Sequence, residues 1–278
     1  MCLFDGCDRI SRRAFVGAAF AAPLVARAHE LSSSRDLVRR DYGYSRDSAR
    51  IEGYVAYRTS RRHAPVVTVM HGNAGLPVDV RDTVDWLALL GFVAFAANPT
   101  TREPDPTTIP RSTLTGRGFG DRYIEDTRAG LAQMRKDGIG RNEGPIALLG
   151  YCGGGYCGLL WNDTPNRDEL GVLVGIHVAL HNFGGDGGIS TSRPQGMDLY
   201  RRMIAPSQFH YGTADHLTPA KDMEELRSEG HRLGRILEIH SYEGADHGFA
   251  MSSDHAYRSD YAAQVRERAA AFLLRHFH

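Results

Sequence analysis

Short apolar runs recur along the chain and alternate with segments whose apolar residues follow helical spacing. A continuous apolar run between turn signals is typical of a buried strand, whereas apolar residues three and four positions apart predict an amphipathic helix. The predicted strands are residues 50–57, 66–70, 92–97, 146–149, 172–178, 207–211 and 236–242, and the predicted helices are residues 79–90, 121–136, 155–161, 219–233 and 257–277. Strands and helices alternate from residue 66 onwards. This order predicts an α/β fold with a mostly parallel central sheet flanked by helices on both faces.

The N-terminal segment, residues 1–28, has a different pattern. The paired arginines Arg12 and Arg13 precede an apolar stretch, residues 16–25, which ends at an A-x-A site of small residues. This arrangement is typical of a twin-arginine export signal, and the stretch is too short to span a bilayer. We therefore expect recognition by the twin-arginine export machinery, a mature chain that begins at His29, and a periplasmic or secreted location. A buried N-terminal helix is the alternative.

Composition supports one large domain after this segment. The chain has 278 residues, of which 42% are hydrophobic, and this is enough to bury a sizeable core. Residues 29–49 are polar and predict a lead-in peptide over the surface, and residues 50–278 predict a single domain. The 33 basic residues balance the 33 acidic residues, so nothing indicates nucleic acid or an anionic membrane as a partner.

A glycine-rich turn that carries a cysteine directly follows the apolar run 146–149. Gly150-Tyr151-Cys152-Gly153-Gly154 is the G-x-S-x-G strand–turn–helix signature with Cys152 in the place of the nucleophile. Such a turn is tight, so its flanking residues must lack side chains. It places the thiol at the N-terminus of a helix, where the helix dipole favours a thiolate. Cys157 lies further along that helix and is predicted to pack in the core. A plain glycine-rich connection with a buried cysteine is the alternative.

A cysteine nucleophile requires a base, and the base requires an orienting acid. Asp215 follows the predicted strand 207–211, and His247 follows the predicted strand 236–242. Ligands of open parallel sheets bind outside the carboxyl ends of the strands, where both residues fall. The order nucleophile, Asp, His is that of the α/β-hydrolase fold. The sequence thus predicts a triad of Cys152, His247 and Asp215; Asp246 adjoins the histidine but is expected to point elsewhere.

Two backbone N–H groups are expected to form an oxyanion hole. One is that of Gly153, which follows the nucleophile. The second is expected from the glycine-rich residues 71–75 after the strand 66–70, and Asn73 is the predicted donor. A simple strand-ending turn is the alternative for this loop.

These blocks resemble the signature blocks of the dienelactone hydrolase family. The resemblance extends from about residue 50 to the C-terminus and rests on three segments, residues 150–155, 211–219 and 244–249. It implies Cys152 as nucleophile with Asp215 and His247 as its partners, a small-molecule ester or lactone as substrate, and no cofactor.

Three positions bear on the substrate that this resemblance implies. Family members that open dienelactone carry a Glu beside the resting thiol, and this chain has Gly72 there. They carry an Arg after the catalytic His that binds the substrate carboxylate, and this chain has Met251 there. Arg102 is matched to a second carboxylate-binding Arg. We therefore expect a different or broader ester substrate.

Two other classes of function are the alternatives to this hydrolase. A metal-dependent hydrolase would use some of the His and Asp residues that cluster after the strands: His177, His181, Asp186, His210, Asp215 and His216. However, a spacing of four residues brings two ligands together on a helix, and His177 ends an apolar strand, so no metal is predicted. A non-catalytic binding protein on a hydrolase fold is the third class, because a fold does not imply a function. Such a protein is expected to lack a triad member, and none is missing here.

Overall fold

The computed structural model describes residues 36–72, 75–103, 105, 117–163, 167–180 and 195–278. The chain divides into two units, residues 1–33 and residues 34–278, and the following description applies to the second unit. The predicted export signal lies outside the described residues and stays a prediction. Among the described residues, no helix is both long and apolar enough to cross a membrane.

One eight-stranded sheet forms the centre of this unit, with the strand order β1-β4-β6-β5-β7-β8-β9-β10. Its strands are β1 (Leu37–Asp41), β4 (Gly53–Arg58), β5 (Val66–Met70), β6 (Val93–Ala97), β7 (Ile146–Tyr151), β8 (Leu170–Ile176), β9 (Ser207–Gly212) and β10 (Leu237–Tyr242). Only the pairings of β4 with β1 and β6 are antiparallel, and all other neighbouring pairs are parallel. The predicted mostly parallel sheet is therefore confirmed.

The segment expected as a polar lead-in contributes to this sheet, which corrects that expectation. β1 pairs with β4, from Leu37 opposite Arg58 to Asp41 opposite Tyr54. It is an edge strand rich in charged residues, and such strands lack the alternation that identifies a half-buried strand. A short hairpin follows, formed by β2 (Tyr44–Arg46) and β3 (Ala49–Ile51). The predicted strand 50–57 is thus divided between β3 and β4.

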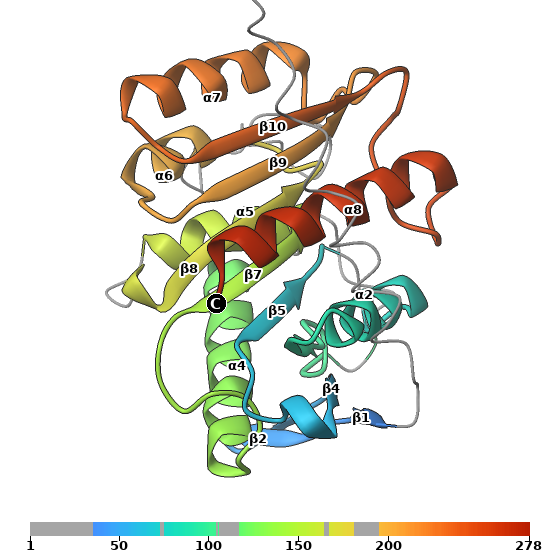
Figure 1. The fold of residues 1–278 in the computed structure, drawn as a ribbon, viewed down its shortest axis with the longest axis vertical. Coiled ribbons are helices and arrows are strands. Elements are labelled where there is room, and N and C mark those ends of the chain that lie inside the picture. Colours follow the sequence, from blue (N-terminus) through green and yellow to red (C-terminus); the bar gives the residue numbers. More distant parts are fainter. Residues whose placement is uncertain (1–35, 73–74, 104, 106–116, 164–166, 181–194) are drawn as a thin grey trace, which may run out of the picture. The chain divides into compact units, whose positions relative to one another are not determined.

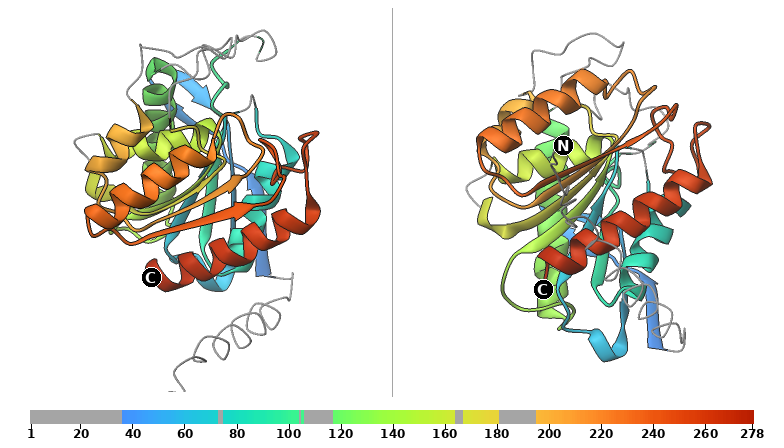
Figure 2. Two further views of the ribbon diagram at one scale, coloured as in Figure 1. Left: turned by 90° about the horizontal axis from the view of Figure 1, so that it is seen from above. Right: turned by 45° about the horizontal axis from the view of Figure 1, so that its top comes forward.

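Helices cover both faces of the sheet, as the sequence predicts. They are α2 (Val78–Leu89), α4 (Arg117–Lys136), α5 (Gly153–Asn162), α6 (Gly196–Arg202), α7 (Ala220–Arg232) and α8 (Ser259–His276). The apolar residues of α2 and α8 belong to one core cluster, and those of α4, α5, α6 and α7 belong to another. In Figure 1, α8 (red) crosses in front of the sheet, and Figure 2 gives the same layers from two other directions. Short 3₁₀ turns, η2 (Thr59–Arg61) and η4 (Arg167–Glu169), complete the connections.

The two core clusters follow from the two-residue period of the strands. In β5, Val66 and Met70 point into the cluster under α4 and α5, whereas Val67 and Val69 point into the cluster under α2 and α8. Burying each such side chain contributes about 1.5–3 kcal/mol. Because both faces are covered, the central strands read as continuous apolar runs, and the carboxyl ends of the parallel strands are left to carry polar residues.

Candidate active site

Cys152 occupies a strained turn between β7 and α5. Its φ of +51° and ψ of −119° lie in a region that a residue with a side chain rarely adopts, and such a conformation costs about 1–3 kcal/mol. The surrounding backbone holds it there. The N–H of Cys152 donates to the carbonyl of Ile176 at 2.9 Å, and its own carbonyl accepts from the N–H of Gly155 at 3.1 Å. The turn thereby projects the thiol from the carboxyl end of β7.

The glycines beside Cys152 are required by main-chain packing. A Cβ added to Gly150 would overlap the backbone of Gly155 on α5, and a Cβ added to Gly154 would overlap the backbone of Met70 on β5. Neither neighbour is a side chain that can move aside. The predicted reason for glycine on both sides of the nucleophile is therefore visible as direct backbone contact.

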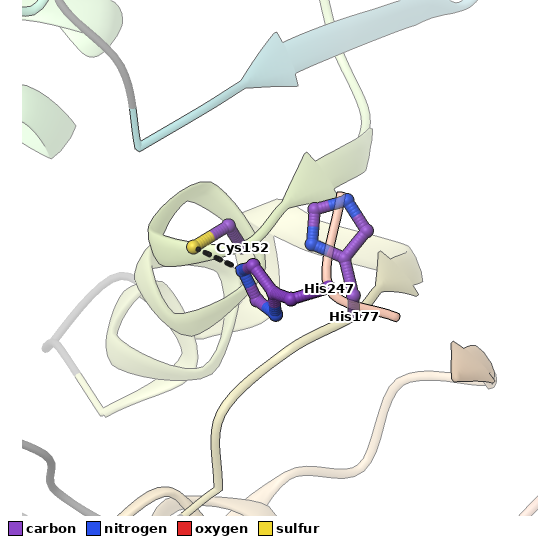
Figure 3. Close-up of side chains that lie close together, drawn as sticks. All are labelled: Cys152, His177 and His247. Atoms are coloured by element: carbon purple, nitrogen blue, oxygen red, sulfur yellow. Dashed lines mark hydrogen bonds between the residues drawn. The ribbon is translucent and has the colours of Figure 1, made fainter. Parts of the chain in front are cut away.

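The structure brings the three predicted triad residues together. Nε2 of His247, which follows β10, lies 3.1 Å from Sγ of Cys152 (Figure 3). Nδ1 of the same imidazole lies 2.9 Å from Oδ2 of Asp215, which follows β9. Oδ1 of Asp215 accepts the N–H groups of Leu217 at 2.8 Å and Thr218 at 3.1 Å. Both oxygens of the carboxylate therefore have hydrogen-bond partners, and the carboxylate holds the imidazole of His247 in one orientation.

These contacts favour a thiolate–imidazolium pair in the resting site. Burial alone raises the pKa of the Cys152 thiol, but the nearby imidazoles of His177 and His247 outweigh it and lower the pKa to about 5. Burial also disfavours the charged form of His247, yet Asp215 and the thiolate raise the pKa of this imidazole to about 10. Burial likewise opposes ionisation of Asp215, but its hydrogen bond and charge interaction with His247 keep the pKa of that carboxyl below its usual value. The arrangement holds a nucleophilic sulfur beside a proton donor across the neutral range.

His177 is a member of this site that the sequence analysis did not place there. It follows β8, the strand next to β7, and its φ of +43° is in the left-handed region. The imidazole is 1% exposed, and its ring centroid lies 4.6 Å from that of His247 (Figure 3). The feature of the sequence that could have identified it is its position just past a predicted strand, where ligands of parallel sheets bind. His181 and Asp186, which the metal-dependent alternative grouped with it, lie outside the described residues.

The space for an oxyanion lies next to Gly153 and Gly72. Gly153 is the first residue of α5, so its N–H has no acceptor four residues earlier within the helix. A Cβ on Gly72 would lie 3.1 Å from the backbone nitrogen of Gly153 and 3.6 Å from Sγ of Cys152. Gly72 thus leaves room beside the thiol. Asn73, the predicted second donor, lies outside the described residues and stays a prediction.

The two other residues predicted to bind substrate have contacts of their own. The guanidinium of Arg102 donates from Nε at 3.1 Å and from a terminal nitrogen at 2.8 Å to the two oxygens of Asp126. Arg46 donates to the same buried carboxylate at 2.9 Å. Met251 is 5% exposed and belongs to the core cluster under α2 and α8. The described contacts therefore connect Arg102 and Met251 to structural partners, and their roles toward a substrate stay predictions.

The remaining His and Asp residues of the metal alternative divide into separate groups. His210 shares hydrogen bonds with Tyr242 at 2.8 Å and Gln208 at 2.9 Å within β9 and β10. Donor atoms of Asp215, His216 and Asp246 lie within 4.8 Å of one another, and the last two residues are exposed. His210 is thus part of a buried hydrogen-bond network rather than of that group.

Comparison with known proteins identifies the family. The sequence model of the dienelactone hydrolase family matches residues 51–277. The chain belongs to the dienelactone hydrolase family. The carboxymethylenebutenolidase of Pseudomonas putida is 26% identical over 217 residues, which cover 76% of this chain and 85% of that protein. Carboxymethylenebutenolidase 1 of Cupriavidus pinatubonensis is 23% identical over 218 residues, which cover 75% and 85% of the two chains.

Solved structures agree on the fold. A dienelactone hydrolase-like promiscuous phosphotriesterase from metagenomic libraries superposes with a TM-score of 0.69 at 18% identity, covering 87% of this chain and all of that one (100%). With the mostly parallel sheet and its two helical layers, this places the chain in the α/β-hydrolase fold.

Proposed function

We propose that the protein hydrolyses carboxylic esters or lactones of small molecules through a cysteine acyl-enzyme. The observation that carries the proposal is the unbroken line of hydrogen-bonding distances from Sγ of Cys152 through His247 to Asp215, 3.1 Å and 2.9 Å long. Its place at a strained turn after a central strand supports the same conclusion. Membership of the dienelactone hydrolase family, and relatives named carboxymethylenebutenolidase, support the class of reaction.

In the proposed reaction the thiolate of Cys152 attacks the acyl carbon, and the carbonyl electron pair moves onto oxygen. The N–H of Gly153, together with a second donor expected at Asn73, stabilises this oxyanion. Collapse expels the alkoxide, which takes the proton from Nε2 of His247 and leaves a thioester. His247 then removes a proton from water as the water attacks the thioester, and collapse releases the acid and restores the thiolate. Asp215 keeps the imidazole in the required tautomer throughout.

We propose that uncharged short-chain esters or lactones are better substrates than dienelactone itself. Met251 is buried where an Arg would be needed for the substrate carboxylate, and Arg102 is paired with Asp126. A missing charge-assisted hydrogen bond to a carboxylate costs about 1.5–3 kcal/mol, which is roughly ten- to a hundredfold in specificity. Dienelactone turnover above that of the best simple ester would show that another cation binds the carboxylate.

The test is a hydrolysis screen of p-nitrophenyl esters, lactones and dienelactone with the wild type, Cys152→Ala and Cys157→Ala. Cys157 is the matched control, because it is the other cysteine among the described residues and is buried within α5. We expect Cys152→Ala to abolish turnover and Cys157→Ala to retain it. Near-normal activity of Cys152→Ala would overturn the mechanism, and a loss equal in both variants would indicate a structural effect.

We further propose that the protein is exported through the twin-arginine route and acts in the periplasm or outside the cell. The support is the paired Arg12 and Arg13 before the apolar stretch 16–25. Replacing both arginines with lysine is expected to hold the precursor in the cytoplasm, as measured by fractionation and by N-terminal sequencing of the exported form. Unchanged export of the double variant would refute this assignment.

A further inference from the structure

Three side chains that bind transition metals meet at the elbow. One donor atom each from Cys152, His177 and His247 lies within 4.8 Å of the other two, and they come from the ends of three parallel strands, β7, β8 and β10 (Figure 3). The proposed ester hydrolysis accounts for Cys152 and His247. The imidazole of His177 helps to lower the pKa of the thiol, but it takes no part in the bond-making and proton-transfer steps of that reaction.

His177 supplies an independent indication of a ligand. Its side chain is almost fully buried, and neither ring nitrogen makes a hydrogen bond of ordinary geometry among the described residues, although the imidazole lies close enough to the thiol to lower its pKa. An unsatisfied buried polar group costs about 1–3 kcal/mol, and its left-handed backbone adds strain. Residues kept at such cost concentrate at functional sites. A cation bound between the three donors would satisfy a nitrogen of His177.

The donor set matches zinc in type and spacing. Zinc prefers thiolate sulfur at about 2.3 Å and imidazole nitrogen at about 2.0–2.1 Å in a tetrahedron, which places the donor atoms about 3.3–3.6 Å apart. Sγ of Cys152 and Nε2 of His247 are already 3.1 Å apart. Side-chain movements on the order of 1 Å bring the third donor into range. The site is partly exposed at Cys152 and His247, which leaves a fourth position for water.

The hydrogen bond between His247 and Asp215 is also of the kind found at metal sites. Metal-binding histidines commonly donate their second ring N–H to a carboxylate, which fixes the tautomer and makes the ring a stronger ligand. Asp215 accepts from Nδ1 of His247 at 2.9 Å and leaves Nε2 directed at the sulfur. The same contact therefore prepares the imidazole for proton transfer and for metal binding.

We propose that Cys152, His177 and His247 form a reversible binding site for a thiophilic divalent cation such as Zn²⁺, and that the bound cation switches hydrolysis off. The cation takes the place of the proton between Sγ and Nε2, and that single proton is released to solvent without any change of oxidation state. Both groups that would act on the ester are then ligands. The inhibitory half of this proposal rests on the proposed function, and the binding half does not.

Binding is tested directly with Co²⁺, which occupies sites of this type and gives a thiolate-to-cobalt charge-transfer band. We expect one equivalent of Co²⁺ to give this band in the wild type, Zn²⁺ to remove it, and Cys152→Ser to lack it. His177→Gln is expected to weaken binding more than about 100-fold, because it removes a ligand rather than a supporting contact. Absence of the band in the wild type at saturating Co²⁺ overturns the proposal, whatever the variants do.

The matched control is His216→Gln. His216 is an exposed member of the neighbouring group that it forms with buried Asp215 and exposed Asp246, so its replacement removes one donor of the competing set and leaves the proposed set intact. We expect its affinity for Co²⁺ to equal that of the wild type. A loss of affinity in His216→Gln with none in His177→Gln would assign the cation to the group of Asp215, His216 and Asp246 and refute the proposed site.

Inhibition is measured as the Zn²⁺ concentration that halves ester hydrolysis, relative to the activity of each variant without metal, with recovery on adding a chelator. We expect that concentration to rise more than about 100-fold in His177→Gln and to stay constant in His216→Gln. A cobalt band without esterase activity would refute the proposed function and keep the binding site. Activation by Zn²⁺ would refute the inhibitory role and favour a metal-dependent hydrolase.

Discussion

The ionisation of Cys152 gives a prediction whose magnitude follows from the structure. With a pKa of about 5, about nine-tenths of the thiol is ionised at pH 6, whereas an ordinary thiol with a pKa of about 8.5 is about 0.3% ionised. This gives about 300-fold more thiolate. A thiolate of low pKa is also a weaker nucleophile, and a Brønsted slope of about 0.4–0.5 over 3.5 units reduces its reactivity by roughly 25- to 55-fold. The excess of thiolate is the larger effect, so Cys152 should react about five- to tenfold faster than an ordinary cysteine.

The assay is the rate of iodoacetamide alkylation at Cys152 between pH 4 and pH 10, read by peptide mass spectrometry in the Cys157→Ala background. We expect a single half-point near pH 5, because alkylation needs only the thiolate. Ester turnover should show this acidic limb and a second one near pH 10, because the leaving alkoxide needs the proton of His247. In His247→Ala the alkylation half-point should move up toward the ordinary thiol value. A wild-type half-point at pH 8–9, or one that does not move in His247→Ala, would refute the resting ion pair.

Four further substitutions test the site and its support. Gly154→Ala should cost more than about 3 kcal/mol, because the added Cβ meets the backbone of β5; thermal unfolding would show it, and Gly118→Ala, which has open space, should unfold like the wild type. Gly72→Ala should lower kcat about 10²-fold with unchanged stability, because its Cβ crowds the amide at the elbow; wild-type kcat would contradict the assigned oxyanion space. Asp215→Asn should lower kcat by about 10⁴-fold, less than loss of the nucleophile, and steady-state kinetics of both variants would reveal a different order. Arg102→Ala should lower the free energy of unfolding by about 2–4 kcal/mol, because it leaves a buried carboxylate with one cation in place of two; unchanged stability in denaturant titration would contradict this account.

The sequence predicted the structure best at positions where a local requirement of the backbone or of burial can be met by few residue types. The strand 146–149 followed at once by Gly150 and Gly154 predicted the elbow, because a tight turn against neighbouring backbone excludes side chains. Asp215 and His247 were found because parallel strands end at a common edge. The central strands were found for a similar reason, since burial on both faces produces unbroken apolar runs.

The features that the sequence did not reveal concern positions where tertiary contacts decide. The strand β1 (Leu37–Asp41) pairs at the sheet edge with charged residues exposed, and no period distinguishes it from a surface peptide. The sequence identified His177 only as the end of an apolar strand. Its position beside His247 depends on which strands become neighbours in the sheet, and the sequence alone did not show this. The pairing of Arg102 with Asp126 joins residues 24 apart through the fold, so the sequence alone did not reveal that partner.

The contact between Gly154 and the backbone of Met70 bears on how the protein's substrate range can be changed by directed evolution. The distance between the sulfur and the loop after β5 is determined by the direct contact between the backbones of Gly154 and Met70, and no side chain lies between them. Libraries that vary the surrounding side chains therefore alter the shape and polarity around the thiol while this spacing stays constant. The glycines of the elbow are therefore to be left untouched in such libraries.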